Sequence, residues 1–278
     1  MNFHTDKWIM QKLEDHYKEA LEHFPEERIV GIFCQGSQNY NLDTKNSDVD
    51  TKLIVLPSFD DIIFNKSAVS TTHIRKNNEH IDFKDIRLMF QTFRKQNLNF
   101  LEILFTEYKI INPMYKELWN RLIAENEKVA RYNEYAAVKA MKGIALEKYH
   151  ALEKPYPSKI EIINKYSYDN KQLHHLARVK EYLDRYMAGE KYADCLISNK
   201  ADYLVELKTT FMPIEDARKL ANQLRDEIVA TADAFCTDNP SNPNPKVDEL
   251  LDTIQSNIIR KYLTYMLIKE ENSEVFCL

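Results

Sequence analysis

The segment between residues 36 and 50 constrains this chain more than any other part of its sequence. It begins with Gly36-Ser37 and ends with Asp48-Val-Asp50, and strand-forming residues flank it at about 28–35 and 48–56. Because successive side chains of a strand point to opposite faces, we expect Asp48 and Asp50 to share one face. Two carboxylates held this close repel each other. A hard divalent cation such as Mg²⁺ or Mn²⁺, which takes oxygen ligands, would relieve that repulsion.

A third carboxylate is available in the segment 79–85, which has the alternation of another short strand. Asp82 falls on the face opposite to the apolar residues, so we expect it beside the aspartate pair in a neighbouring strand. Three such acids can hold two metal ions about 3.5–4 Å apart, an arrangement suited to in-line displacement at phosphorus. Glu79 and Asp85 are alternatives for the third ligand.

The Gly-Ser turn suits the binding of phosphate groups. Glycine at position 36 lets the backbone approach a phosphate closely, and Ser37 offers both a hydroxyl and an N–H. A phosphate-binding turn followed by metal-binding acids is typical of nucleotidyl transfer from a nucleoside triphosphate.

These residues resemble the signature of the DNA polymerase β-like nucleotidyltransferase superfamily. More narrowly, the chain is similar to predicted nucleotidyltransferases found near RNA-repair genes in bacteria and phages. The resemblance rests on three motifs in the same order, which are Gly36-Ser…Tyr40-Asn-Leu-Asp-Thr…Ser-Asp-Val-Asp50, Asn97-Leu-Asn-Phe-Leu-Glu-Ile-Leu104 and Tyr168-Asp-Asn-Lys-Gln-Leu-His-His-Leu-Ala-Arg178. The second motif departs from the family, because Leu98 stands where a proline is usual, and this weakens any role assigned to Glu102.

The resemblance implies a palm-like catalytic core in which Asp48, Asp50 and Asp82 are catalytic and hold two Mg²⁺ or Mn²⁺ ions. It implies a nucleoside triphosphate, ATP among the candidates, as one substrate. An RNA 3′ end, such as that of a tRNA, is the favoured acceptor. Relatives in the wider superfamily leave two alternatives open: nucleotidylation of a protein or small molecule, and a non-catalytic nucleotide-binding or antitoxin-like module.

The third motif predicts a basic stripe on a helix. Lys171, His175 and Arg178 follow the i, i+4, i+7 spacing of one helical face. By itself this pattern most often marks a solvated surface, but the resemblance makes these three residues, with Gly36 and Ser37, nucleotide-binding candidates. Asp169 is expected to cap or orient the helix.

Glu102 lies within the apolar run of residues 100–105. Its carboxylate is either exposed or turned inward. An unpaired charge in the interior costs several kcal/mol, so an inward Glu102 requires an Arg or Lys partner.

Composition sets the outer limits. The 278 residues carry a net charge of −5, which argues against a protein that coats nucleic acid non-specifically and restricts any RNA contact to a local patch. We expect no membrane span and a cytoplasmic location, because no apolar run is long enough and no signal peptide is evident. The four scattered cysteines are typical of reduced thiols.

The sequence predicts an α+β fold with two parts. Residues 1–112 should form a nucleotidyltransferase catalytic domain built on a small mixed β-sheet, and residues 113–278 a helical domain that completes the active-site cleft. Helices are expected near 6–24, 86–96, 114–131, 134–152, 168–188, 213–235 and 246–270, with a loop at 237–245. A further small strand is expected at residues 70–74.

Overall fold

The computed structural model describes residues 2–275 and has the expected α+β architecture. Its single sheet is mixed, with the strand order β3-β4-β2-β1-β5. The central strand β2 is parallel to β4, and the other neighbouring strands are antiparallel. The strands are β1 (Ile29–Gln35), β2 (Asp50–Val55), β3 (Ser70–Ile74), β4 (His80–Asp85) and β5 (Lys109–Ile111). The four predicted strands are present, and β5 was not anticipated.

Pairing of the strands brings polar residues of three strands onto one face of the sheet. Gln35 of β1 lies opposite Asp50 of β2. Two residues further along, Lys52 of β2 lies opposite Asp82 of β4. Because alternate residues share a face, all four side chains lie on the same side of the sheet.

The two faces of the sheet have different cover. Helix α1 (Asp6–Ala20) packs on one face over a small cluster that includes Ile32, Leu53 and Phe83. The other face packs against helix α3 (Ile86–Arg94) and, around it, α4 (Leu98–Leu101), η3 (Glu102–Leu104), α5 (Lys116–Ile123) and α13 (Pro245–Val275). This second core continues without interruption into the helices below the sheet.

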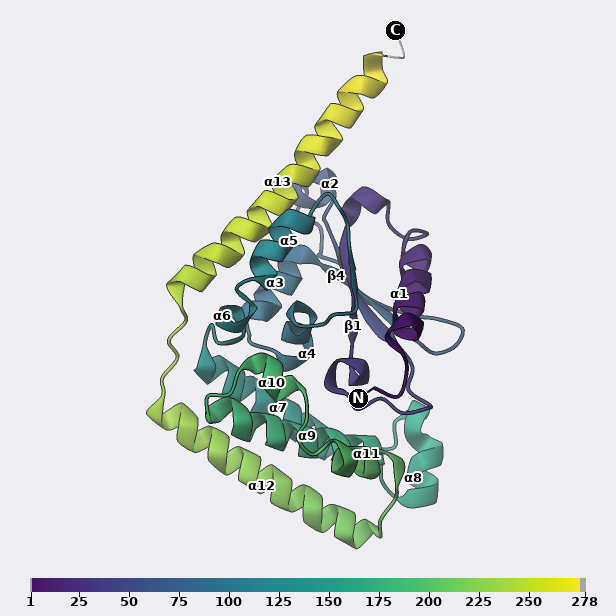
Figure 1. The fold of residues 1–278 in the computed structure, drawn as a ribbon, viewed down its shortest axis with the longest axis vertical. Helices are drawn as coiled ribbons and strands as arrows, with labels where there is room; N and C mark the ends of the chain where they lie inside the picture. Colours follow the sequence, from purple (N-terminus) through teal and green to yellow (C-terminus); the bar gives the residue numbers. More distant parts are fainter. Residues whose placement is uncertain (1, 276–278) are drawn as a thin grey trace.

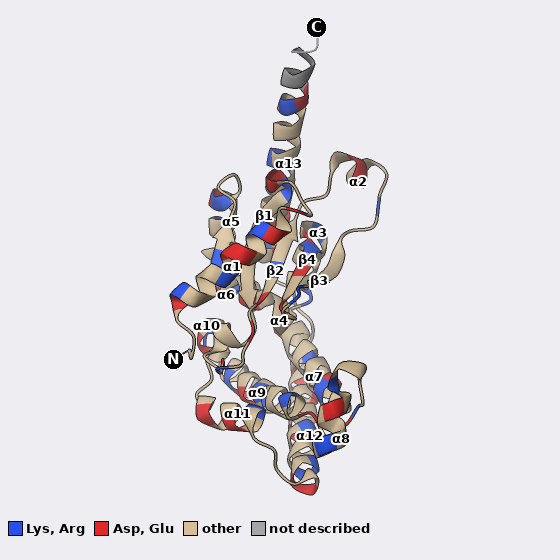
Figure 2. Ribbon diagram, turned by 90° about the vertical axis from the view of Figure 1, so that its right-hand side faces the viewer, with Lys and Arg blue, Asp and Glu red and all other residues tan. Residues whose placement is uncertain are grey.

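Those helices form a separate layer at one end of the sheet (Figure 1). The layer is built from α7, α9, α11 and α12, which pack on one another, with α8 and α10 at its edges. Their bounds are α6 (Asn126–Ala130), α7 (Glu134–Ala151), α8 (Ile160–Tyr166), α9 (Asn170–Met187), α10 (Tyr192–Leu196), α11 (Ala201–Thr209) and α12 (Ile214–Asp238), α6 being the short link that precedes them. Figure 2 shows acidic and basic residues where this helical layer meets the sheet.

The long helix α13 returns from the helical layer to the sheet. After the loop that follows α12, it packs against α3 and α5 (Figure 1). The helix predicted at 114–131 is divided into α5 and α6 by a turn at residues 124–125. The domain boundary at residue 112 stays a prediction.

Two expectations from composition concern the thiols and the membrane. Cys34, Cys195 and Cys236 are free thiols, and Cys34 is buried in strand β1, while Cys277 lies outside the described residues. Within residues 2–275, no helix combines the length and the apolar character needed to cross a bilayer.

Candidate active site

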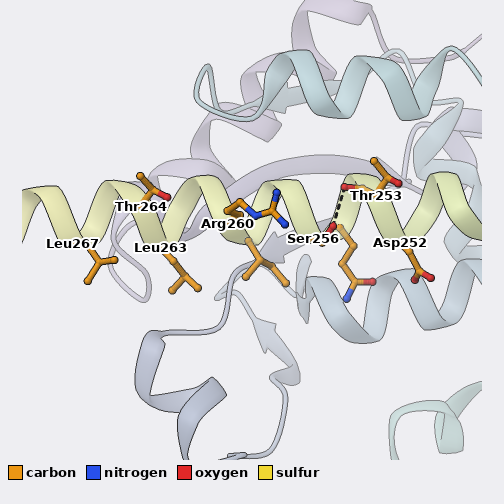
Figure 3. Close-up of a pocket in the computed structure, with 9 residues that line it drawn as sticks. Asp252, Thr253, Ser256, Arg260, Leu263, Thr264 and Leu267 are labelled. Atoms are coloured by element: carbon orange, nitrogen blue, oxygen red, sulfur yellow. Dashed lines mark hydrogen bonds between the residues drawn. The ribbon is translucent and has the colours of Figure 1, made fainter.

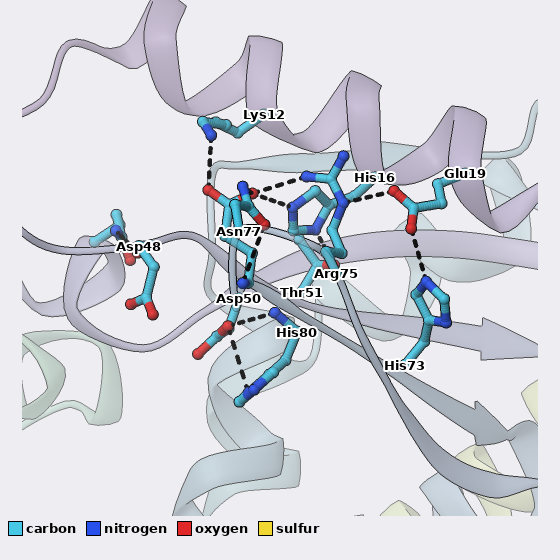
Figure 4. Close-up of polar contacts among 12 residues, drawn as sticks. Lys12, His16, Glu19, Asp48, Asp50, Thr51, His73, Arg75, Asn77 and His80 are labelled. Atoms are coloured by element: carbon cyan, nitrogen blue, oxygen red, sulfur yellow. Dashed lines mark hydrogen bonds and ion pairs between the residues drawn. The ribbon is translucent and has the colours of Figure 1, made fainter. Parts of the chain in front are cut away.

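Asp48 and Asp50 lie close together, although not in the way that the sequence predicted. Strand β2 begins at Asp50, so Asp48 belongs to the preceding loop and the expected strand alternation does not apply to it. The loop is held by Gln38, whose Nε2 donates to the Asp48 carbonyl at 2.6 Å. Burial and the charge of Asp48 both raise the pKa of Asp50. Figure 4 shows the two carboxylates at the start of β2.

His80, the first residue of β4, also contacts Asp50. Its backbone N–H donates to Asp50 Oδ1 at 2.8 Å, and its imidazole Nδ1 lies 3.8 Å from the same oxygen. The N–H partly offsets the rise in the pKa of Asp50. Spacing in the sequence gave no reason to select this histidine, because the contact depends on the parallel pairing of β2 and β4.

Asp82 shares the face of Asp50 but is already engaged. Its carboxylate accepts hydrogen bonds from Thr72 at 2.6 Å, from Gln35 at 3.0 Å and from Lys52 Nζ at 3.4 Å. Burial opposes ionisation of Asp82, yet the charge of Lys52 and these hydrogen bonds lower its pKa overall. Among residues 2–275, no three His, Cys, Asp or Glu side chains converge as a ready-made metal site. The structure therefore joins Asp48 to Asp50 and places Asp82 nearby in an ion pair with Lys52.

The two alternative third ligands point away from this site. Glu79 and Asp85 differ from Asp82 by an odd number of residues, so they lie on the opposite face of β4. Glu79 is buried and bonded to Lys12 at 2.7 Å, His16 at 3.0 Å, Arg75 at 2.7 Å and Asn77 at 2.6 Å. Figure 4 shows these four partners beneath α1. Asp85 caps α3 and pairs with Arg87 at 2.7 Å. Both carboxylates are therefore engaged in structural contacts outside the candidate site.

The Gly36 turn has a backbone that requires glycine. Its φ of 93° and ψ of −148° lie in a region that residues with a Cβ rarely adopt. A Cβ at this position would meet nothing within 4 Å, so backbone conformation and not space selects glycine. The turn leads into the short 3₁₀-helix η2 (Ser37–Tyr40), which begins at Ser37.

Glu102 turns inward, where the charge of Arg178 acts on it although the described residues show no direct ion pair between the two. The side chain, only 2% exposed, accepts a short hydrogen bond from the Tyr40 hydroxyl and a longer one from Gly36 N at 3.4 Å. Burial raises the pKa of Glu102, while Tyr40 and the charge of Arg178 oppose the rise. The Arg178 guanidinium lies 3.7 Å from the centre of the Tyr40 ring. Arg178 therefore lies behind the Gly36 turn, and its Nε has no hydrogen-bond partner among the described residues.

Helix α9 carries the predicted basic stripe. As expected, Asp169 caps the helix by accepting a hydrogen bond from Lys171 N at 3.0 Å. The exposed Lys171 side chain is near enough to Asp50 for its charge to lower the pKa of that carboxyl. Burial and the neighbouring His174, Arg178 and Lys171 hold the pKa of His175 well below its usual value, so His175 is neutral at pH 7. Lys171 is thus the member of the stripe that faces the carboxylates.

A second lysine faces the carboxylates and was not predicted. Lys208 lies near the end of α11, and its Nζ is 3.2 Å from both the Leu42 carbonyl and Ser47 Oγ. Burial and the charge of Lys171 lower the pKa of Lys208 to about 8, against the attraction of Asp48 and Asp43. No helix was expected at α11, so this residue had no place in the predicted site.

A cavity of about 680 Å³ lies elsewhere, along the exposed side of α13 (Figure 3). None of the predicted site residues lines it. Its walls are Asp252, Thr253, Gln255, Ser256, Ile259, Arg260, Leu263, Thr264 and Leu267.

Comparisons with known proteins place little constraint on this site. No protein-family model matches the sequence, and no curated protein matches it. Among solved structures, the chain is similar to a nucleotidyltransferase-like protein from Exiguobacterium sibiricum, with 14% identity over 94% of this chain and 80% of that one. The TM-score of 0.30 is too low to identify a common fold.

Proposed function

We propose that this protein transfers a nucleoside monophosphate from a nucleoside triphosphate to a hydroxyl group and releases pyrophosphate. One observation carries the proposal. The neighbouring carboxylates Asp48 and Asp50 lie within the electrostatic reach of Lys171 and Lys208 from the helical layer, and Lys208 Nζ is 3.2 Å from the hydroxyl of Ser47, the residue before Asp48. Paired acids opposed by lysines suit a substrate that consists of a divalent cation and a polyphosphate.

The residues present fit a divalent cation. Burial and Asp48 raise the pKa of Asp50, and a cation bound between the two carboxylates would remove that penalty. Asp48 and Asp50 would hold Mg²⁺ or Mn²⁺, and Asp82 on the same sheet face would complete the ligands of a second ion. When bound, such ions supply neutralisation of phosphate charge and a lower pKa for the attacking hydroxyl.

The remaining chemistry falls to the protein's own side chains and backbone. The acceptor oxygen forms a bond to the α-phosphorus as the bond from that phosphorus to the β-bridging oxygen breaks, and pyrophosphate leaves. Asp82 takes the proton of the acceptor hydroxyl and passes it to solvent. Lys171 and Lys208 balance the charge of the leaving pyrophosphate. Gly36 and Ser37, with Arg178 and neutral His175 behind them, complete the nucleotide site.

An RNA 3′ end, that of a tRNA included, is the acceptor that we favour. Support comes from the sequence resemblance, whose three motifs occur in the same order as in predicted nucleotidyltransferases near RNA-repair genes. A protein or small-molecule hydroxyl is the second candidate. A non-catalytic nucleotide-binding module is less consistent with Asp48 and Asp50, because a protein without turnover gains nothing from a repelling carboxylate pair.

Label transfer tests the proposal. Each α-³²P nucleoside triphosphate is incubated with the protein, Mg²⁺ or Mn²⁺, and either total RNA or a protein lysate. The Asp48→Ala/Asp50→Ala double variant is the control. Label on RNA that disappears in this variant supports the proposal and identifies the base. Label on protein supports the second candidate, a protein acceptor. Triphosphate binding with no label on any acceptor contradicts catalysis.

A further inference from the structure

Three lysines lie near Asp82, two of them over the ring of Phe100. Lys52 Nζ lies 4.2 Å from the ring centre and Lys84 Nζ lies 5.2 Å from it. Lys95, at the end of α3, is close enough for its charge to act on Lys84. We call Lys52, Lys84, Lys95 and Phe100 the Phe100 platform. Of these residues, only Lys52 belongs to the site described above, as the ion-pair partner of Asp82.

The positive charge of this platform is not balanced. Lys52 is buried and pairs with Asp82 at 3.4 Å. Lys84 instead donates to the Ser70 hydroxyl at 2.8 Å, and within residues 2–275 neither Lys84 nor Lys95 forms an ion pair. An added anion would supply the missing counter-charge.

The platform also has the right position for an acceptor. Lys84 follows Asp82 by two residues on the same face of β4, which places their Cα atoms about 6–7 Å apart. Lys171 and Lys208 act on the other end of the site, at Asp50 and Asp48. Lysines of the helical layer therefore act on Asp48 and Asp50, and a separate group of lysines lies beside Asp82.

Phe100 explains how the lysines are held. Its ring is partly buried in the packing between the sheet and α4, and two ammonium groups lie over it. A cation over an aromatic face is stabilised by about 0.5–2 kcal/mol. The ring is thus occupied by the two lysines, and Lys84 also reaches Ser70 of β3.

We propose that Lys84 and Lys95 bind a backbone phosphate of a single-stranded RNA acceptor, adjacent to Asp82. The inference rests on the proposed nucleotidyl transfer and assigns the acceptor side of that same site. A protein hydroxyl acceptor brings no phosphate and would leave both lysines uncompensated. Because the net charge of the chain is −5, such local pairs of lysines must supply the attraction for RNA.

Fluorescence anisotropy with a short 5′-fluorescein-labelled single-stranded RNA tests the subsite without nucleotide or turnover. The binding constant is measured over a range of KCl concentrations for the wild type and for Lys84→Gln and Lys95→Gln. Each phosphate contact contributes about 0.7 to the slope of log K against log salt for a single strand. We expect each variant to bind several-fold more weakly and to lose about that much slope. Lys116→Gln, which changes an exposed lysine on α5, should match the wild type.

Two results would overturn the subsite: a wild type that does not bind the RNA, or variants whose salt slope equals that of the wild type. Thermal stabilisation by a triphosphate with Mg²⁺ is measured on the same variants and should be retained. A wild type that does not bind RNA, but binds triphosphate and transfers label to protein, would refute the subsite alone. Absence of any label transfer by a wild type that binds RNA through Lys84 and Lys95 would refute the proposed reaction alone.

Discussion

Lys208 offers the sharpest test of how the site is assembled, through the substitution Lys208→Met. Methionine retains the length of the lysine side chain and removes its charge. In the folded protein, burial and Lys171 lower the pKa of Lys208 from 10.5 to about 8. The protonated lysine is therefore a cost to folding at pH 7.

The size of that cost follows from the pKa. A shift from 10.5 to about 8 corresponds at most to about 3 kcal/mol. Because Lys208 is partly exposed, solvent screening reduces this to about 1–2 kcal/mol. The sign is fixed by proton binding. Between pH 8 and pH 10.5 the unfolded chain binds more protons at Lys208 than the folded one, so the stability of the wild type rises with pH in that window.

Urea unfolding of the wild type and Lys208→Met from pH 7 to pH 10.5 measures this effect. The difference in unfolding free energy between the two proteins should change by about 1–2 kcal/mol in favour of the wild type as pH rises. Contributions of the hydrogen bonds to Leu42 and Ser47 that do not depend on pH cancel in this comparison. At pH 7, the variant should also lose most of the thermal stabilisation by a triphosphate with Mg²⁺. Lys200→Met, at an exposed lysine before α11, is the matched control. A stability difference that is constant with pH, together with unchanged triphosphate binding, would refute the reasoning.

Three other predictions follow from contacts in the sheet. Asp50→Asn should reduce label transfer at least about 100-fold. Its thermal stability should not fall, because the repulsion between Asp50 and Asp48 is removed. Asp60→Asn, at an exposed position, should leave label transfer unchanged. Glu79→Gln should lower the unfolding free energy in urea by about 3 kcal/mol at pH 7, since its partly buried cationic partners Lys12 and Arg75 lose their counter-charge. The pKa of Glu79 is lowered by folding, so this difference should be present above pH 4.5 and shrink as pH falls; equal urea midpoints at pH 7 would contradict the assignment. Tyr40→Phe should cost about 1–3 kcal/mol in the same assay by removing the hydrogen bond to buried Glu102, and an unchanged midpoint would show that this bond contributes nothing.

Local patterns in the sequence predicted those parts of the site that depend on local structure. Alternation placed Asp82 on the correct face of β4 and predicted that strand within a residue of its observed bounds. The capping role of Asp169 follows from its position before a helical pattern. The requirement for a cation near Glu102 follows from the cost of burying a charge, although the sequence did not identify Arg178 as that cation.

The remaining parts depend on pairing between distant segments. Lys52 is the partner of Asp82 because β2 and β4 are parallel and their register places these two residues opposite each other. A single sequence does not reveal that register. The sequence assigned Asp48 to a strand that in fact begins at Asp50. A hydrogen bond from the Gln38 side chain to the Asp48 carbonyl holds Asp48 in the preceding loop. Lys208 lies on a nine-residue helix that buries only Leu204 and Leu207, too few apolar positions to give a recognisable period.

The contacts of α9 and α11 explain why the carboxylates need the helical layer. Arg178 of α9 lies against Tyr40 and acts on Glu102, and Lys208 of α11 bonds the loop at Leu42 and Ser47. The segment that carries Gly36 and Asp48 is therefore held on both sides by residues more than 130 positions away in the sequence. Asp50 is held within the sheet by β2 and by the His80 N–H, whereas Asp48 belongs to the loop that Gln38 and this clamp hold. Under the proposed function, breaking the contact between Arg178 and Tyr40 should weaken Mn²⁺ binding by the pair in a calorimetric titration, even though neither residue is a proposed ligand.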